Sequence, residues 1–171
     1  MINCPQTDTQ NVLEHGYAVH AQYCKLIQNP PELLADCWPW FLNQINQYSP
    51  ENIYTYHIYH DCGKPFCLTY DESGRRHFPQ HAKTSYYTWL KYSDNELIAN
   101  WILHDMDIHL ISAEQVPEFF TLEGSAILLL TGLAEIEANA AMFGGRQSIS
   151  YKSKYSQWKR RAKAYCKLIP M

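Results

Sequence analysis

The chain has 171 residues, a formal net charge of −3 and 46% hydrophobic residues, which fits one soluble domain able to bury a core without disulfides. No apolar run approaches the roughly eighteen residues of a membrane span, and the longest, 126–130, is typical of a core helix. The start, Met1 to Pro5, lacks the basic and apolar layout of a signal peptide. We therefore expect a cytoplasmic single domain over residues 1–171 with no membrane partner.

Helical signals dominate along the chain. Thr9 can cap a first helix, which Asn29-Pro30-Pro31 ends near residue 28. Asp71-Glu72-Ser73-Gly74 predicts a turn or hairpin, and Gly144-Gly145 separates the last helix from the rest. No segment shows the sustained alternation of a half-buried strand, so the expected fold class is all-α. The expected helices cover residues 9–28, 31–48, 49–61, 81–92, 94–109, 112–118, 122–142 and 151–168.

The six cysteines show no paired metal-binding spacing. The closest pair, Cys62 and Cys67, straddles Pro65. A disulfide framework is not expected in a chain of this size with many aromatic residues for its core. We interpret the cysteines as free thiols in a reducing cytoplasm. They stand at positions 4, 24, 37, 62, 67 and 166.

The segment His60-Asp61-Cys62-Gly63-Lys64, followed by Pro65, is the most informative motif. Adjacent residues on a helix diverge by about 100°, so the imidazole and the carboxylate can reach one ion only if it lies over the edge of the helix. Neutral imidazole nitrogen and carboxylate oxygen together suit Zn, Mn, Fe, Co or Ni. The motif therefore indicates a metal site at the end of the helix that begins near Ser49.

Other imidazoles and acids stand on helices that could converge on this pair. His15 and His81 lie on predicted helices, and His104 lies in His104-Asp105-Met106-Asp107. Histidine is a frequent metal ligand because its pKa lets it be neutral near pH 7. Asp105 or Asp107 could orient an imidazole. A late helix carries further acids in Glu135-Ile136-Glu137-Ala138.

The order of these segments resembles the HD superfamily of metal-dependent phosphohydrolases. The stretch from Tyr59 to His104 is most similar to the HD domain attached to bacterial CCA-adding tRNA nucleotidyltransferases and to related HD modules of RNA-end repair enzymes. The resemblance spans roughly residues 9–145. It implies a single HD-domain helical bundle. Beyond that span, the sequence itself predicts a basic C-terminal helix at about 151–168.

The resemblance also implies a divalent metal cofactor (Mn, Co, Ni, Fe, Zn or Mg). The family's last ligand is usually an aspartate, and Glu137 takes that place here, with Glu135 as the alternative. His20 is the alternative to His15 as the first ligand. His81 and His104 would hold a second ion or donate to phosphate. The implied ligands are His15, His60, Asp61, His81, His104 and Glu137, and the implied catalytic residues are His60, Asp61, Lys64, His81 and His104.

The expected reaction is hydrolysis of a phosphate ester by metal-activated water. The resemblance implies a phosphomonoesterase or a 2′,3′-cyclic phosphodiesterase that acts on nucleotides or RNA ends. A small nucleoside triphosphate hydrolase and a non-catalytic nucleotide- or RNA-binding HD module remain alternatives. The candidate phosphate-binding residues are Lys64, Arg75, Arg76, Lys83, Lys159 and Arg160.

Charge is distributed unevenly along the chain. All seventeen acids lie at or before Glu137, whereas the last 34 residues hold eight of the fourteen Lys and Arg and no acid. Bases interleaved with aromatics over 151–163 are typical of a single-stranded nucleic acid site. The aromatics also recur at spacings of three and four, however, and the alternative interpretation is a buried aromatic helix face with the bases on the solvated one.

Overall fold

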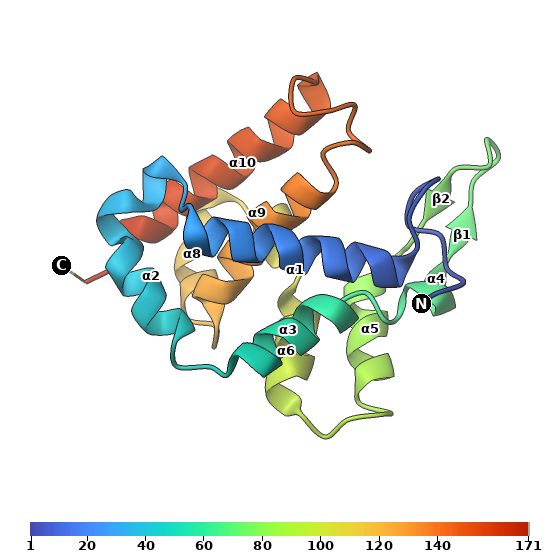
Figure 1. Ribbon diagram of the computed structural model, residues 1–171, viewed down its shortest axis with the longest axis horizontal. Helices are drawn as coiled ribbons and strands as arrows, with labels where there is room; N and C mark the ends of the chain where they lie inside the picture. The colour runs from blue at the N-terminus through green and yellow to red at the C-terminus, as the bar shows by residue number, and fades with distance from the viewer. Residues whose placement is uncertain (171) are drawn as a thin grey trace.

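The computed structural model describes residues 1–170, so Met171, the last residue of the predicted domain, lies outside the described residues. The fold is mostly helical, with one small two-stranded hairpin (Figure 1). The helices are α1 (Val12–Gln28), α2 (Trp38–Ile45), α3 (Pro50–Tyr59), α4 (Lys64–Cys67), α5 (His81–Trp89), α6 (Glu96–His104), α7 (Asp107–Leu110), α8 (Val116–Phe120), α9 (Ser125–Ala138) and α10 (Ile149–Cys166).

Three shorter features connect these helices. Two 3₁₀ turns, η1 (Glu32–Cys37) and η2 (Ala113–Gln115), precede α2 and α8. The strands β1 (Thr69–Tyr70) and β2 (Arg76–His77) pair antiparallel, with Thr69 opposite His77. The turn or hairpin predicted around Asp71 to Gly74 is therefore present. Among residues 1–170, no helix combines the length and apolar character needed to cross a membrane.

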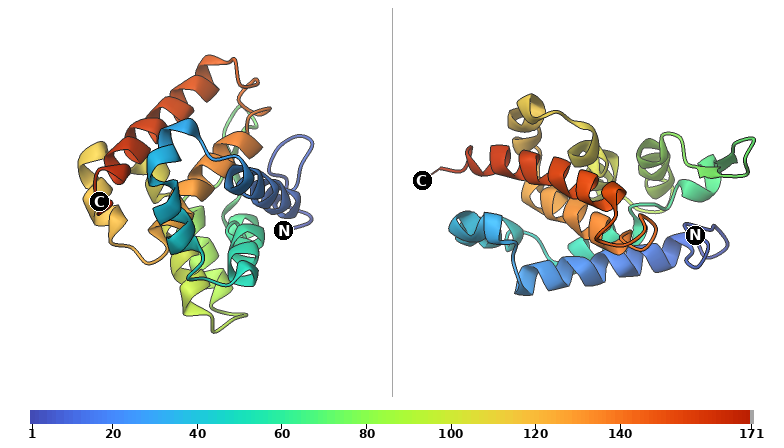
Figure 2. Two further views of the ribbon diagram at one scale, coloured as in Figure 1. Left: turned by 60° about the vertical axis from the view of Figure 1, so that its left-hand side comes forward. Right: turned by 90° about the horizontal axis from the view of Figure 1, so that it is seen from above.

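Helix α9 forms the centre of the fold because it is apolar on nearly every side. Its residues from Ser125 to Ala134 are all buried. It packs against α1, α2, α7, α8 and α10, while α3 packs on α1 and α6, and α5 packs on α4 and α6. Figure 2 shows α1 and α10 running along α9. Helix α1 packs on both α3 and α9 and so connects the helix that ends in the His-Asp motif to the centre of the fold.

Helix α10 buries its aromatic face and exposes its bases. Tyr151, Trp158 and Tyr165 are buried, and the indole nitrogen of Trp158 donates to the carbonyl of Leu129 at 2.9 Å. The exposed bases of the helix are Lys152, Lys154, Lys159, Arg160 and Lys163. Of the two interpretations of the tail, the buried aromatic face is therefore present, and the bases remain free to contact an anion.

Several predicted helices are shorter or divided. The first helix is capped by Asn11, which forms a capping box with Glu14, rather than by Thr9. The predicted helix 31–48 divides into η1 and α2, with Pro39 at the start of α2. The predicted helix 94–109 breaks after His104, and α7 starts at Asp107. Because of this break, His104 in α6 pairs with Asp107, whereas His109 in α7 contacts Glu135 of α9.

Candidate metal centre

The His-Asp motif occupies the turn that follows α3. His60 is the C-cap of α3, and its Nδ1 lies 2.7 Å from the carbonyl oxygen of His57. Because a carbonyl can only accept, Nδ1 carries the proton and donates it to His57. The Nε2 atom of His60 is therefore directed at the interior. This is the arrangement that metal-binding histidines use, with the second ring nitrogen bonded to a backbone carbonyl.

Two close helix approaches bring the other groups to this turn. A Cβ on Gly16 of α1 would lie 2.7 Å from the carbonyl oxygen of Ile58, so only glycine lets α1 approach α3 this closely. The neighbouring residue, His15, thereby reaches the site. A Cβ on Gly63 would lie 2.3 Å from the backbone nitrogen of Ser85, so the turn also packs directly on α5. That contact places His81, in the first turn of α5, beside Asp61.

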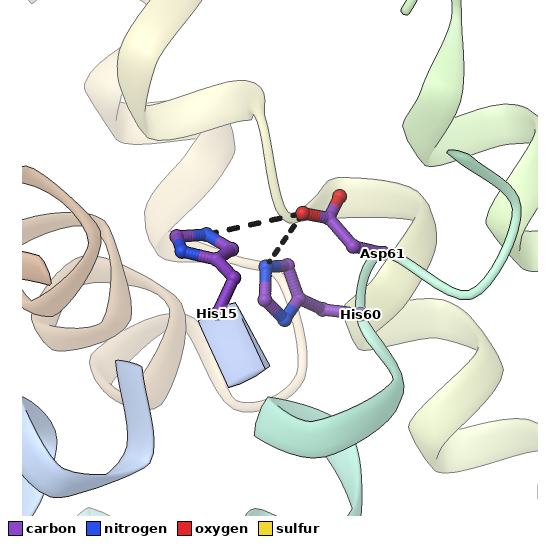
Figure 3. Close-up of side chains that lie close together, drawn as sticks. All are labelled: His15, His60 and Asp61. Atoms are coloured by element: carbon purple, nitrogen blue, oxygen red, sulfur yellow. Dashed lines mark ion pairs between the residues drawn. The ribbon is translucent and has the colours of Figure 1, made fainter. Parts of the chain in front are cut away.

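Figure 3 shows His15, His60 and Asp61 converging from α1 and from the turn after α3. The Oδ2 atom of Asp61 lies 3.3 Å from His60 Nε2 and 3.9 Å from His15 Nε2. Its Oδ1 atom lies 3.7 Å from the Nε2 of His81. The side chains of His15, His60 and Asp61 are almost fully buried, whereas the side chain of His81 is 19% exposed. His81 therefore stands at the open edge of the cluster.

Glu135 completes the cluster from α9. Its Oε1 lies 2.9 Å from His60 Nε2 and 4.0 Å from His15 Nε2, and its Oε2 lies 3.2 Å from His109 Nε2. Glu137, the residue assigned as a ligand from the sequence, is directed elsewhere. Its carboxylate accepts from the hydroxyl of Tyr151 and pairs with Arg146. The structure thus brings Glu135 rather than Glu137 to the cluster, since residues two apart lie on different faces of a helix.

The donor atoms of this cluster fit a metal ion. Two overlapping groups of buried ligand atoms could hold one: His15, His60 and Asp61, and His60, Asp105 and Glu135. Within residues 1–170, His15 Nδ1 and Asp61 Oδ1 have no partner at hydrogen-bond distance, whereas His60 Nε2 and Asp61 Oδ2 have only their ion-pair contacts with Glu135 and Lys64. Such groups are costly to bury unless something satisfies them. Two imidazoles with carboxylates suit Zn, Mn, Fe, Co or Ni.

Opposing effects set the protonation of the central pair. Burial alone would lower the pKa of His60, but the nearby charges of Asp61 and Asp105 outweigh it and hold that pKa well above its ordinary value. Burial alone would raise the pKa of Asp61, but Lys64 and His60 hold it well below its ordinary value. Burial lowers the pKa of His15 to about 4, against the pull of Asp61, so this imidazole is neutral at pH 7.

Asp105 belongs to the second group of possible ligand atoms, with His60 and Glu135. It accepts a hydrogen bond from the hydroxyl of Tyr56 at 2.5 Å. Burial, reinforced by the charge of Glu135, raises the pKa of Asp105 to about 7. Burial would also raise the pKa of Glu135, but the imidazoles of His109 and His60 hold it well below its ordinary value. Glu135 is therefore ionised at neutral pH, whereas Asp105 is partly protonated there.

Lys64 joins the cluster to a surface groove. Its ammonium lies 2.5 Å from Asp61 Oδ2, donates to the Gln6 side chain at 2.9 Å, and stands over the ring of Phe78 at 5.0 Å. The side chain of Lys64 is buried. Gln6 and Phe78 both line a groove of about 1090 Å³. Lys64 therefore lies between Asp61 and the lining of the groove.

The groove brings two predicted phosphate-binding residues to this end of the molecule. Arg75 and Arg76 line it from the hairpin, and the segment 6–10 lines it from the opposite side. Arg76 pairs with Asp8 at 2.5 Å, and Arg75 is exposed. The N-terminal loop and the hairpin lie side by side at one end of the molecule, away from the C terminus (Figure 1). Two guanidinium groups beside a metal-compatible cluster can bind a phosphate.

The structure does not bring every predicted site residue to the cluster. His104 pairs with Asp107 at 2.7 Å and is about one-third exposed. His20, the alternative to His15, contacts His57 and Cys24 instead. The exposed bases Lys83, Lys159 and Arg160 do not line the groove.

The sequence did not predict two residues that the structure brings to the cluster, His109 and Tyr56, and a physical reason explains each omission. His109 reaches Glu135 because the chain bends between α6 and α7, whereas one continuous helix would place it differently. Tyr56 reads as one more aromatic of α3, and only its contact with Asp105 distinguishes it. Asp105 was considered only as a group that orients an imidazole, although its own carboxylate belongs to a possible ligand group.

No family model matches this chain, and no curated protein or solved structure matches it either.

Proposed function

We propose that this chain is a metal-dependent phosphohydrolase with an HD-type helical bundle, which acts on phosphate esters of nucleotides or RNA ends. One observation carries the proposal. Buried imidazole and carboxylate groups from α1, the turn after α3 and α9 converge, Asp61 Oδ1 among them has no hydrogen-bond partner within residues 1–170, and the cluster adjoins a groove that contains two arginines. The order of His15, His60-Asp61 and a late acid, which resembles the HD superfamily, supports the same class.

The residues of the cluster have distinct tasks in this proposal. A bound divalent ion supplies Lewis acidity and lowers the pKa of its water toward neutrality. His15, His60, Asp61 and Glu135 would hold the ion. The His57 carbonyl fixes the ring of His60 by accepting from Nδ1 at 2.7 Å, which keeps Nε2 available as a ligand atom. Mn, Co, Ni, Fe, Zn and Mg are the candidate ions.

His81 would contact the substrate in this proposal. Its Nδ1 lies 3.0 Å from the carbonyl of Phe78 and therefore carries a proton. Its Nε2 faces Asp61 at the more exposed edge of the cluster, where it can accept a proton or, when protonated, donate to a phosphate oxygen. Arg75 and Arg76 would hold a phosphate in the groove, whose volume exceeds that of most small-ligand pockets. A nucleotide or the end of an RNA strand fits such a space.

A non-catalytic binding module is the second candidate, and one observation favours it. The Lys64 ammonium already pairs with Asp61 Oδ2 at 2.5 Å, so it can neutralise the carboxylate that an ion would use. In that case the groove would bind a nucleotide or an RNA end without hydrolysis. Substituting Lys64 by Gln separates the two candidates. It should leave metal content unchanged in an enzyme, but raise it if the lysine takes the place of the ion.

The proposal is tested by phosphate release. EDTA-treated protein should hydrolyse p-nitrophenyl phosphate, nucleotides, nucleoside triphosphates or 2′,3′-cyclic nucleotides only after Mn, Co, Ni or Mg is added. Asp61→Ala should abolish activity because it removes both a ligand and a charge. Asp107→Ala, which removes an exposed carboxylate outside the cluster, is the matched control and should retain activity. Hydrolysis that survives EDTA or the Asp61 substitution would refute the assignment.

A further inference from the structure

The structure brings together two cysteines that are far apart in the sequence. Cys37 ends η1, and Cys166 ends α10. Their sulfur atoms lie 2.8 Å apart, across a separation of 129 residues. All six cysteines are free and lie within the described residues, but these two alone are hydrogen-bonded to each other. Cys24 instead contacts an imidazole, while Cys62 and Cys67 donate to backbone carbonyls.

We propose that Cys37 and Cys166 are a modification site, where a small-molecule disulfide such as oxidised glutathione converts the two thiols into a cross-link. Disulfide sulfurs are about 2.05 Å apart, so the two side chains need to move by less than an ångström to bond. Both residues are half-buried rather than sealed in the core. A small disulfide can therefore approach after a modest opening of this end of α10.

The exchange runs in two balanced steps. The Cys37 thiolate attacks one sulfur of oxidised glutathione, which forms a mixed disulfide and releases one glutathione thiolate. Cys166 then passes its proton to the glutathione thiolate released in the first step and attacks the Cys37 sulfur, which breaks the mixed disulfide and releases the second glutathione as a thiolate. Two protein thiols are oxidised and one glutathione disulfide is reduced. Burial and the neighbouring Cys37 raise the pKa of Cys166 to about 12, so Cys166 is protonated at neutral pH and is assigned the second step.

The cross-link would enclose most of the chain. The loop from residue 37 to residue 166 contains the whole candidate metal centre except His15. Closing a loop of this length restricts the unfolded chain strongly. It also pins the end of α10 to η1, with the aromatic rings of Trp40, Phe41 and Tyr165 packed nearby. Oxidation should therefore stabilise the fold without altering the groove at the opposite end of the molecule.

The experiment compares reduced protein with protein incubated in oxidised glutathione. The oxidised protein should be lighter by two hydrogen atoms, and peptide mapping should find Cys37 joined to Cys166. Its Tm should rise by about 10 °C, and a thiol reductant should reverse the change. Cys37→Ser and Cys166→Ser should each prevent the cross-link, whereas the matched Cys24→Ser and Cys67→Ser should permit it.

Three outcomes would overturn the proposal. These are a stable glutathione adduct on either cysteine, a different cysteine pair in the peptide map, and retention of all six reactive thiols after oxidation. Because the mass and the thiol count are measured on the unaltered chain, the result does not depend on whether the serine variants fold.

Discussion

Glu135 and Glu137 offer a matched test of the candidate metal centre. They lie two residues apart on α9, and the same change, Glu→Gln, removes one negative charge from each with little change in volume. Glu135 contacts His60 and His109, whereas Glu137 contacts Tyr151 and Arg146. If the cluster holds an ion, only the first substitution should weaken metal binding.

The expected magnitudes follow from these contacts. Removing an outer partner of a metal ligand typically costs about 10- to 100-fold in affinity, so loss of a direct carboxylate should cost at least about 100-fold, or about 2.8 kcal/mol. Glu137→Gln should leave affinity within about twofold. It should lower stability by about 1–2 kcal/mol because the charged acceptor of the Tyr151 hydroxyl is lost. The Arg146 contact adds little since that side chain is largely exposed.

Calorimetric titration with Mn or Zn measures the affinities, and thermal unfolding measures the stabilities. A metal-binding defect in Glu137→Gln with normal binding in Glu135→Gln would refute the assignment of the α9 ligand. Equal affinities in wild type and both variants would show that α9 contributes no ligand.

Two further predictions concern the helices around the site. Gly16→Ala should destabilise the protein by about 1–3 kcal/mol and reduce its metal content, because the new methyl group forces α1, and with it the His15 imidazole, away from α3. Thermal unfolding measures the first effect and elemental analysis the second. Unchanged metal content would contradict the argument from the close approach of the two helices. Charge reversal at Lys159, Arg160 and Arg161 should weaken oligonucleotide binding and flatten its salt dependence without changing hydrolysis of a small ester. Unchanged oligonucleotide affinity would instead favour a small nucleotide as the substrate.

The spacing of His15, His60 and Asp61 made part of the site predictable. The His-Asp motif marks its own position at the end of a helix, whereas the choice between His15 and His20 stayed open in the sequence, and the structure brings His15 to the cluster. Helix α9 offered no such guide. Its sequence is apolar on nearly every side, so no polar stripe indicates which glutamate faces the cluster. The choice between Glu135 and Glu137 depends on the rotation of α9, which its packing against α1 and α10 determines.

The helical fold class was equally predictable, because the spacing of apolar residues indicates helices without tertiary information. The breaks within helices were not. The bend at Asp105 and Met106 has no proline or glycine to mark it, yet it decides that His109 reaches Glu135 while His104 faces solvent beside Asp107. A uniform helix over 94–109 therefore predicted the wrong arrangement for this segment.

The charge balance of the cluster leads to the last prediction. Three buried carboxylates, Asp61, Asp105 and Glu135, face one buried ammonium, that of Lys64. Without an ion, bound protons offset part of this excess negative charge. The pKa of His60 lies well above its ordinary value, and burial raises the pKa of Asp105 to about 7. Metal ligands must be deprotonated, so an ion that binds at pH 7 displaces these protons.

Metal affinity should consequently fall as the pH drops below 7 and rise as the pH increases above it, since fewer protons then have to leave. Calorimetric titration at pH 7 in two buffers of different ionisation enthalpy measures the number released. The expected result is a net release of protons that decreases toward alkaline pH. Asp105→Asn should reduce the release at pH 7 because that side chain has no proton to lose. Binding without proton release at pH 7 would show that the ion does not enter between His60 and these carboxylates.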